Sequence, residues 1–335
     1  KKRRGVDRPG RLVVTLLSLL FLSTAVFATV KYVFRAPELD TDKPVVTPDG
    51  TASADVDRTD TDEPDAPGRT RRKYCYNILV SGLDDDNGGS DTNILVRFDV
   101  PNKRIDLVSL PRDTLLHNEY RNNKLNFAYA KGGTELLMEQ IENLLGVPVD
   151  FYVTVNLKGF IALVDQIDGV DFDIPINMDY DDPYQDLHIH FTKGPRHLNG
   201  QEAMEVVRFR HNNDGTGYGT EDIGRIGTQQ AFLKAVAKQL LQIGNVKNIP
   251  ALVDIFCTYV KTDLTTGNLV WLGNEALNIG TENIHFATLP GDGSGYYNKQ
   301  SVYVLDAQAT CDLVNEALNP YNEALTLEDM DILVP

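Results

Sequence analysis

Cysteine is scarce in this 335-residue chain, which has only Cys75, Cys257 and Cys311. Three thiols permit at most one disulfide bond, so the sequence excludes the disulfide-stapled scaffolds of small secreted proteins. Because all three lie in apolar runs, we expect buried thiols, and a bridge between Cys257 and Cys311 stays open as the alternative.

Positive charge is also in short supply, because 32 Lys and Arg face 48 Asp and Glu, a net charge of −16. This balance excludes a protein that binds nucleic acid through bulk charge. The basic residues are unevenly spread, since six of the first 11 residues are Lys or Arg. A basic head on an acidic body indicates that the two parts occupy different compartments.

Charge is absent altogether between Leu12 and Val30. A helix of this length spans about 28 Å, close to the hydrocarbon thickness of a bilayer. We therefore expect a cytoplasmic basic tail over residues 1–11, a single transmembrane anchor over 12–34 and an extracytoplasmic remainder, since Lys and Arg before a span stay in the cytoplasm. A signal peptide cleaved near Val26-Phe27-Ala28 is the alternative.

Large apolar residues are nearly missing from the next segment. Residues 36–68 hold five prolines, ten acids and two bases, a composition that cannot bury enough surface to fold. We expect a disordered linker over 35–73, followed by one extracytoplasmic domain over 74–335.

Strand and helix patterns alternate through that domain. A hairpin turn is expected at Pro101-Asn102. Strands are expected at 76–83, 93–100, 104–110, 151–156, 170–174 and 284–288, and helices at 134–145, 157–167, 220–243, 249–260, 267–278 and 306–318. This interleaving predicts a three-layer α-β-α domain around a central mixed sheet.

Polar residues follow the predicted strands, where open α/β sheets bind ligands. Asp84 and Asp91 lie at the ends of consecutive strands and can hold a hard cation such as Mg²⁺; a loop of solvated aspartates is the alternative. Arg112 follows the next strand, and Lys124 stands a few residues later, before a glycine pair. An Arg112–Asp113 surface pair is the competing interpretation.

A further set of cations lies later in the chain. Arg208 and Arg210 are two residues apart and would share one face of an extended segment. Asp222, Arg225 and Gln229 share one face near the start of a predicted helix. Guanidinium groups gathered in an acidic domain favour a phosphate ester, because their forks match phosphate oxygens. Internal salt bridging is the alternative.

Two histidines two residues apart, His188 and His190, would share a strand face, a spacing that can bind zinc. We favour a plain exposed strand here, because no cysteine or acid stands clearly in register. The nearby aspartates fit no EF-hand spacing and favour a solvated loop. This set comprises Asp179, Asp181, Asp182 and Asp186.

The motifs GLD…GGSDTNILV, SLPRDT, KLNFAYAKGG, VVRFRH and EDIGRIGTQQ, in this order, resemble those of the LytR-CpsA-Psr family of cell-envelope proteins. They span residues 76–243, and the N-terminal anchor matches the family's layout. Two positions depart from the family pattern, because Gly89 and Thr228 stand where arginine is common. Each departure removes one phosphate contact.

The resemblance implies a phosphotransferase that moves an anionic glycopolymer from a polyprenyl diphosphate carrier to peptidoglycan at the cell membrane, with no nucleic acid partner. It implies that Asp84 and Asp91 bind Mg²⁺ or Mn²⁺. It also implies that the diphosphate is bound by Arg112, Lys124, Arg208, Arg210, Arg225 and Gln229, supported by Asp222, and that catalysis depends on Arg112, Arg208, Arg210, Arg225 and Asp91.

Two other functions stay open for the same site: a prenyl diphosphate pyrophosphatase, and a non-catalytic envelope regulator that binds lipid or wall. A lipid-linked substrate would also need an apolar tunnel among the predicted helices, since exposed isoprenoid is unfavourable in water. The residues expected to line it are Leu137, Ile141, Phe160, Leu163, Phe232 and Val236.

Overall fold

The computed structural model describes residues 35–39, 69–83, 89–118, 120–184, 187–218, 221–240, 255 and 258–335, without the side chains of 221–223, 225 and 226. The predicted basic tail and anchor, and with them Asp84 and Cys257, lie outside these residues. Within the described ranges, no helix is long and apolar enough to cross a membrane.

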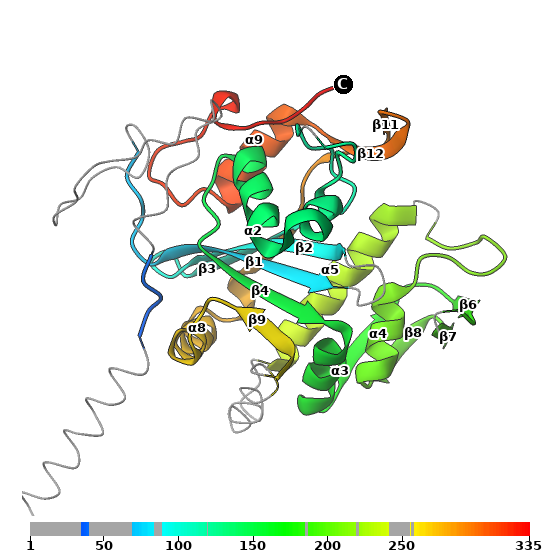
Figure 1. Cartoon of the computed structure of the whole chain (residues 1–335). Coiled ribbons are helices and arrows are strands. Elements are labelled where there is room, and N and C mark those ends of the chain that lie inside the picture. Colours follow the sequence, from blue (N-terminus) through cyan, green and yellow to red (C-terminus); the bar gives the residue numbers. More distant parts are fainter. Residues whose placement is uncertain are drawn as a thin grey trace, which may run out of the picture.

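A six-stranded mixed sheet forms the centre of the domain (Figure 1). Its strands lie in the order β10-β3-β2-β1-β4-β9, with β1 parallel to β4, β10 parallel to β3 and the other neighbours antiparallel. The strands are β1 (Cys75–Leu83), β2 (Ser90–Asp99), β3 (Arg104–Leu110), β4 (Phe151–Asn156), β9 (Val260–Thr262) and β10 (Ile284–Thr288).

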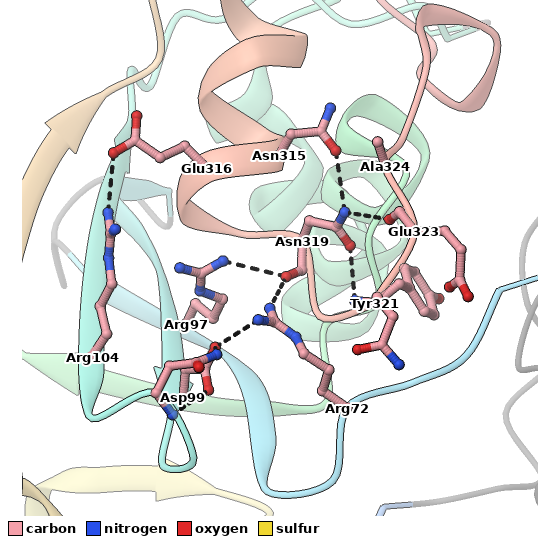
Figure 2. Close-up of a pocket in the computed structure, with 12 residues that line it drawn as sticks. Arg72, Arg97, Asp99, Arg104, Asn315, Glu316, Asn319, Tyr321, Glu323 and Ala324 are labelled. Carbon is pink, nitrogen blue, oxygen red and sulfur yellow. Dashed lines mark hydrogen bonds and ion pairs between the residues drawn. The ribbon is translucent and has the colours of Figure 1, made fainter.

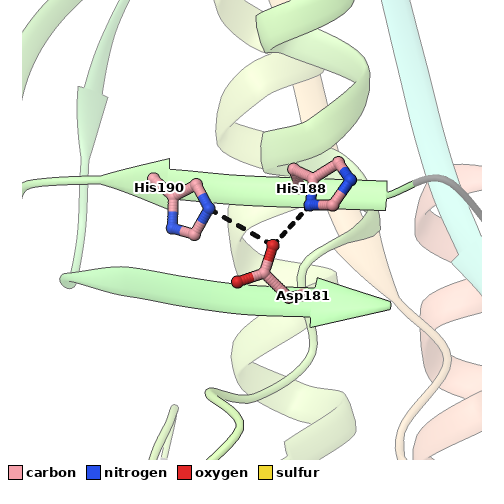
Figure 3. A group of neighbouring side chains, drawn as sticks. All are labelled: Asp181, His188 and His190. Atoms are coloured by element: carbon pink, nitrogen blue, oxygen red, sulfur yellow. Dashed lines mark hydrogen bonds and ion pairs between the residues drawn. The ribbon is translucent and has the colours of Figure 1, made fainter. Parts of the chain in front are cut away.

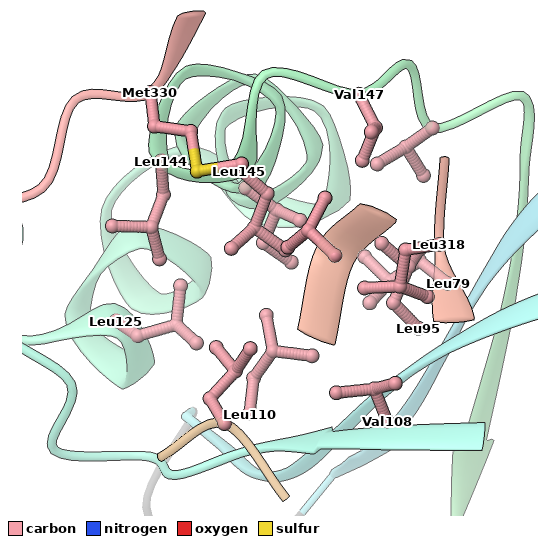
Figure 4. Packing of buried hydrophobic residues seen from close by; sticks show 14 of the residues in the cluster. Leu79, Leu95, Val108, Leu110, Leu125, Leu144, Leu145, Val147, Leu318 and Met330 are labelled. Carbon is pink, nitrogen blue, oxygen red and sulfur yellow. The ribbon is translucent and has the colours of Figure 1, made fainter. Parts of the chain in front are cut away.

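Helices cover both faces of this sheet. On one face, α2 (Leu125–Leu145) and α9 (Ala307–Ala317) lie over a core that includes Leu79, Leu95 and Val108 (Figures 1 and 4). On the other face, α8 (Thr266–Ile279) packs against a separate cluster. The predicted three-layer domain with a central mixed sheet is therefore confirmed. Shorter elements complete this part: η1 (Thr281–Asn283), β11 (Gly291–Tyr297), β12 (Gln300–Leu305) and η2 (Leu327–Asp329).

A third hydrophobic cluster lies beside the sheet and holds three helices and two small two-stranded sheets together (Figure 1). Phe232 is fully buried in it, and its ring contacts the rings of Phe160 and Phe172. The elements are α3 (Leu157–Gln166), α4 (Gly200–Arg208) and α5 (Glu221–Leu240), with β5 (Val170–Ile174) paired to β8 (Gly194–Leu198) and β6 (Met178–Asp182) paired to β7 (Leu187–Phe191).

Parts of the expected linker lie against the folded domain. Pro37 is buried, and its carbonyl oxygen accepts a 3.0 Å hydrogen bond from Tyr76 Oη, while Leu39 packs on the α8 side of the sheet. Arg69, Arg71 and Arg72 form ion pairs with the domain. Contacts to the domain thus begin before residue 74.

Two helices differ from their expected form. α2 begins at Leu125 rather than Thr134 and is kinked where Gly132 and Gly133 leave helical dihedral angles. Residues 206–208 are helical rather than extended, because Asn199 and Glu202 form a reciprocal capping box that starts α4. The helix expected at 249–260 lies largely outside the described residues.

Candidate functional site

The ends of several strands meet at one edge of the sheet. The register pairs Gly82 with Thr92 and Asn93 with Leu110, so β2 starts where β1 and β3 end. The parallel pairing of β1 with β4 brings the end of β4 to this edge as well. Asp91, at the start of β2, and Arg112, just beyond β3, are thereby neighbours.

Four charged residues form a connected chain at this edge. Arg112 Nη1 lies 2.5 Å from Asp91 Oδ1, and Arg112 Nε lies 3.7 Å from Asp113 Oδ1. Lys124 Nζ lies 3.2 Å from the same Asp113 oxygen. The side chains are 20–36% exposed, so solvent and an anion can reach both cations. The structure thus brings Asp91, Arg112 and Lys124 together.

Backbone hydrogen bonds fix the two cations relative to each other. The Asn126 N–H donates to Arg112 O at 2.9 Å, and the Leu125 N–H donates to Thr114 O at 3.0 Å. The start of α2 is therefore attached to the segment that follows β3. Lys124 is the N-cap residue of α2, in extended conformation, and this places it beside Asp113.

Helix α5 connects this edge to the end of α4. Gln229 Nε2 donates to Val207 O at 3.0 Å, next to Arg208, the last residue of α4. Gln230 Nε2 donates to Ala287 O at 2.7 Å and to Thr288 Oγ1 at 2.8 Å, and lies 3.3 Å from Ser109 Oγ. Neighbouring glutamines therefore hold the end of α4 and the ends of β3 and β10 to one stretch of α5.

The remaining predicted residues are described to different extents. Arg208 is half-buried, and its Nη1 lies 4.0 Å from Met204 Sδ. Arg210 is exposed and follows the buried Phe209. Arg225 lies in α5 one turn before Gln229, but its side chain and that of Asp222 lie outside the description. The joint diphosphate site of all these residues stays a prediction.

The residues at this edge supply only part of a magnesium site. Asp91 is a suitable oxygen ligand, but its carboxylate contacts Arg112, and its expected partner Asp84 lies outside the described residues. Among the described side chains, the one group of three or more potential ligands close together is elsewhere, at Asp181, His188 and His190. The fit of a metal here rests on Asp91 alone.

An open pocket of about 400 Å³ lies at the other end of the sheet, beside the β2–β3 turn and the C-terminal segment (Figure 2). Its arginines are already neutralised, since Arg72 pairs with Asp99 at 3.0 Å and Arg97 pairs with Asp106 at 2.7 Å. Arg104 contacts Asp106 as well. These contacts tie the arginines of the pocket into a structural ion-pair network.

The side chains expected to line a tunnel divide between two clusters. Leu137 and Ile141 are fully buried in the core between α2 and the sheet. Phe232 and Val236 belong to the cluster beside the sheet, where Phe160 packs on Phe232. These residues therefore belong to two separate buried clusters, and the apolar tunnel stays a prediction.

Two features of the site were not predicted from the sequence. Asp113, considered only as a surface partner of Arg112, lies between Arg112 and Lys124. Gln230, rather than Gln229, connects α5 to the strand ends. No sequence pattern shows which of the two glutamines contacts the strand ends. By contrast, the alternating charges of Arg112, Asp113 and Lys124 could have indicated that Asp113 lies between the two cations.

Comparison with known proteins places this geometry in a family. The chain is 31% identical to the polyisoprenyl-teichoic acid–peptidoglycan teichoic acid transferase TagV of Bacillus subtilis, over 71% of this chain and 62% of that protein. It is 32% identical to the transferase of the same description, TagU, of Bacillus cereus, over 71% and 76%. It is 29% identical to the regulatory protein MsrR of Staphylococcus aureus, over 67% of both.

The fold agrees with these sequence similarities. The crystal structure of Bacillus subtilis TagV matches with a TM-score of 0.63 and 27% identity, over 78% of this chain and all of that one. The LytR_cpsA_psr family description matches residues 46–319, most of the chain. The chain therefore belongs to the LytR_cpsA_psr family.

Proposed function

We propose that this protein is a phosphotransferase that moves an anionic glycopolymer from a polyprenyl diphosphate carrier to peptidoglycan, forming a phosphodiester. Its membership of the family and the printed activities of TagV and TagU support this proposal. The observation that carries it is the solvent-accessible chain of Asp91, Arg112, Asp113 and Lys124 at the sheet edge. Paired guanidinium and ammonium groups at such an edge suit a diphosphate.

The proposed reaction exchanges one phosphorus–oxygen bond for another. A hydroxyl oxygen of peptidoglycan attacks the phosphorus that carries the glycopolymer, and the bond from this phosphorus to the bridging oxygen breaks. Polyprenyl phosphate leaves with the electron pair, and the hydroxyl proton passes to a general base. Arg112 and Lys124 stabilise the charge that develops on the phosphoryl and leaving oxygens.

We propose that Arg208, Arg210 and Arg225 complete the diphosphate site. The hydrogen bond from Gln229 to Val207 supports this, because it holds the end of α4 against α5. A ligand in this site would draw Arg112 away from Asp91 or bind beside the pair, since the two side chains contact each other in the unliganded chain.

We propose further that Asp84 and Asp91 bind Mg²⁺, or Mn²⁺ in its place. The ion supplies positive charge next to the phosphoryl group when bound. Residues 12–34 are proposed to anchor the domain on the outer side of the membrane, where a lipid carrier is available. The charge-free run and the basic residues before it support this topology.

The test uses the purified full chain with a lipid-linked glycopolymer and peptidoglycan, and measures covalent attachment and polyprenyl phosphate release. Arg112→Ala and Arg208→Ala should each lower transfer roughly tenfold to over a hundredfold, because charged hydrogen bonds contribute about 1.5–3 kcal/mol. Arg196→Ala is the matched control, since Arg196 forms an exposed pair with Glu202 on β8 and α4. Equal turnover in all three variants would contradict the proposed site.

Metal removal gives a second readout of the same proposal. Excess chelator should abolish transfer, and added Mg²⁺ should restore it. Asp91→Asn should weaken metal-dependent transfer more than it weakens lipid binding without metal. Full activity in chelator would remove the metal from the proposed mechanism.

A regulatory function is the second candidate, and the name of MsrR favours it. The product analysis separates the candidates. Release of polyprenyl phosphate without attachment would indicate a pyrophosphatase, and lipid binding without any release would indicate a non-catalytic regulator.

A further inference from the structure

The hairpin of β6 and β7 places histidines opposite aspartates. Its antiparallel register pairs Asp181 with His188 and Asp179 with His190. Side chains alternate along each strand, so Met178, Ile189 and Phe191 are buried beneath the hairpin while these four polar residues share its exposed face. The sequence showed no acid clearly in register with the two histidines, and the structure identifies Asp181 as that acid.

Both imidazoles converge on one carboxylate oxygen (Figure 3). His188 Nδ1 contacts Asp181 Oδ1, and His190 Nε2 lies 3.4 Å from the same oxygen. Candidate ligand atoms of the three residues all lie within 4.8 Å of one another. Zinc binds its nitrogen and oxygen ligands at about 2.0–2.2 Å, so two ligands of one ion lie at most about twice that distance apart. A small rotation of the two imidazole rings would bring the three candidate ligand atoms within this limit.

A second carboxylate orients one of the rings. Asp179 Oδ1 lies 2.8 Å from His190 Nδ1. When Nδ1 donates its proton to Asp179, neutral His190 presents the lone pair of Nε2 to Asp181 Oδ1. Two acceptors that face each other need a proton or a cation between them, and a carboxylate on the far nitrogen is the usual outer partner of a metal-bound histidine.

We propose that Asp181, His188 and His190 bind a transition metal ion of the zinc class, with Asp179 positioning His190. Two imidazoles with one carboxylate favour zinc over magnesium or calcium, which prefer oxygen ligands. About half of each of the three ligand side chains is exposed, so the ion reaches the site from solvent and keeps a coordination position for water.

Bound metal would also steady the loop that follows Arg210. Asn212 Oδ1 accepts from the Asp179 N–H at 2.7 Å, and Asn213 Oδ1 accepts from the Asp181 N–H at 2.6 Å. The ring of His211 packs edge-on against Tyr180, with centroids 5.6 Å apart. An ion that holds β6 to β7 therefore restrains the strand on which residues 211–213 rest.

The test is calorimetric titration of the full chain with ZnCl₂, with MgCl₂ as the comparison ion. We expect one zinc ion per chain to bind at this hairpin. Any heat from magnesium, which is proposed to bind at Asp84 and Asp91, should be unchanged in His190→Gln. Asp179→Asn should lower zinc affinity about 10–100-fold, and His188→Gln or His190→Gln should lower it further, because each removes a ligand rather than an outer partner.

His197→Gln is the matched control. His197 Nδ1 lies 2.8 Å from Asp171 across β5 and β8, an exposed cross-strand pair of the same kind without a second histidine. Zinc binding unchanged in His190→Gln, or weakened equally in His197→Gln, would overturn the proposal. All these side chains are exposed, so folding of the variants is expected and is checked by circular dichroism.

Two further measurements connect binding to geometry. Co²⁺ in place of zinc should give the intense visible absorption of a four-coordinate site in the wild type and lose it in His188→Gln. Hydrogen exchange at residues 211–213 should slow when zinc is added, and should not slow in His190→Gln. Octahedral cobalt spectra with unchanged exchange would indicate a loose surface contact and would contradict the proposed site.

Discussion

The ion pair of Asp91 and Arg112 holds two side chains of the candidate site next to each other but contributes little to the free energy of unfolding. Both side chains are partly exposed, and pairs of this kind contribute about 0–1 kcal/mol. Their separation by a ligand is correspondingly easy. An anion can therefore take Arg112 from Asp91, which leaves the carboxylate available to a cation.

Buried thiols give a prediction for single residues. Burial is the largest cause that raises the pKa of Cys75, to about 11, and nearby Asp99 adds to it. Burial also raises the pKa of Cys311, and both cysteines are unbridged, as expected from their apolar surroundings. Since only the thiolate reacts, about one Cys75 in a thousand is reactive at pH 8.

In a Cys257→Ser background, we therefore expect neither thiol to react rapidly with Ellman's reagent in the native protein at pH 8. Both should react after unfolding in urea, and the native rate for Cys75 should rise as the pH approaches its pKa. Rapid labelling of either thiol in the native protein would contradict this prediction, because it would show that the residues burying that thiol move aside readily.

At the scale of elements, the glycine that ends α2 and a glycine inside α8 should respond oppositely to alanine. Gly146 has φ +65°, and a Cβ there would collide with the carbonyl oxygen of Asp329. Gly146→Ala should lower the free energy of unfolding by more than the about 1–2 kcal/mol of left-handed strain alone. Gly273 is helical with open space around it, so Gly273→Ala should raise stability by about 0.5–1 kcal/mol.

Urea unfolding of both variants measures this pair, with the wild type in the same experiment. If both variants shift the urea midpoint in the same direction, the left-handed conformation of Gly146 and its close approach to Asp329 at the end of α2 would be contradicted.

Most of the expected strands and helices begin within a few residues of the predicted positions, whereas α2 begins nine residues early. The bounds of β3, β4 and β10 equal the predicted 104–110, 151–156 and 284–288, because short apolar runs between turn residues define them. Helix α4 was missed because Val206 and Val207 favour an extended reading. The capping signature Asn199…Glu202 is its one clear local signal.

Contacts at the site were predictable only where strand order dictates them. Asp91 and Arg112 meet because both lie at one edge of a sheet whose hairpin was foreseen. The pairing of Asp181 with His188 depends on the register of β6 and β7. The four residues between these strands, 183–186, lack the two-residue turn signal that would fix this register from the sequence. Side-chain register of this kind requires the tertiary structure.

At the scale of the whole molecule, three arginines near the start of the domain hold it to distant segments. Arg71 pairs with Asp150 before β4, and Arg72 pairs with Asp99 at the end of β2. Arg69 pairs with Asp329 near the C-terminus. These three ion pairs form a closure that joins the start of the domain to its middle and to its C-terminal end. Arg72 and Asp99 also line the pocket shown in Figure 2.

The pair of Arg69 and Asp329 makes this closure sensitive to acid. It is bidentate, with distances of 2.8 and 2.6 Å. Burial alone would raise the pKa of Asp329, but hydrogen bonds from Arg69 and from Thr326 outweigh it and hold the pKa below its ordinary value of 3.8. A lowered pKa in the folded state adds stability above the unfolded value, and this stability is lost as the pH falls through the folded value.

Arg69→Ala should therefore lower the free energy of unfolding by about 1–2 kcal/mol at pH 7, allowing for partial exposure of the pair. The difference from wild type should persist at pH 5 and shrink below pH 3.8, where Asp329 takes up its proton. Arg196→Ala, which breaks the more exposed pair with Glu202, should change stability by less at pH 7. Urea unfolding at pH 7, 5 and 3 measures all three chains. A constant difference between wild type and Arg69→Ala across this range would mean that Arg69 acts through packing rather than through the Asp329 carboxylate, and the closure would then not depend on charge.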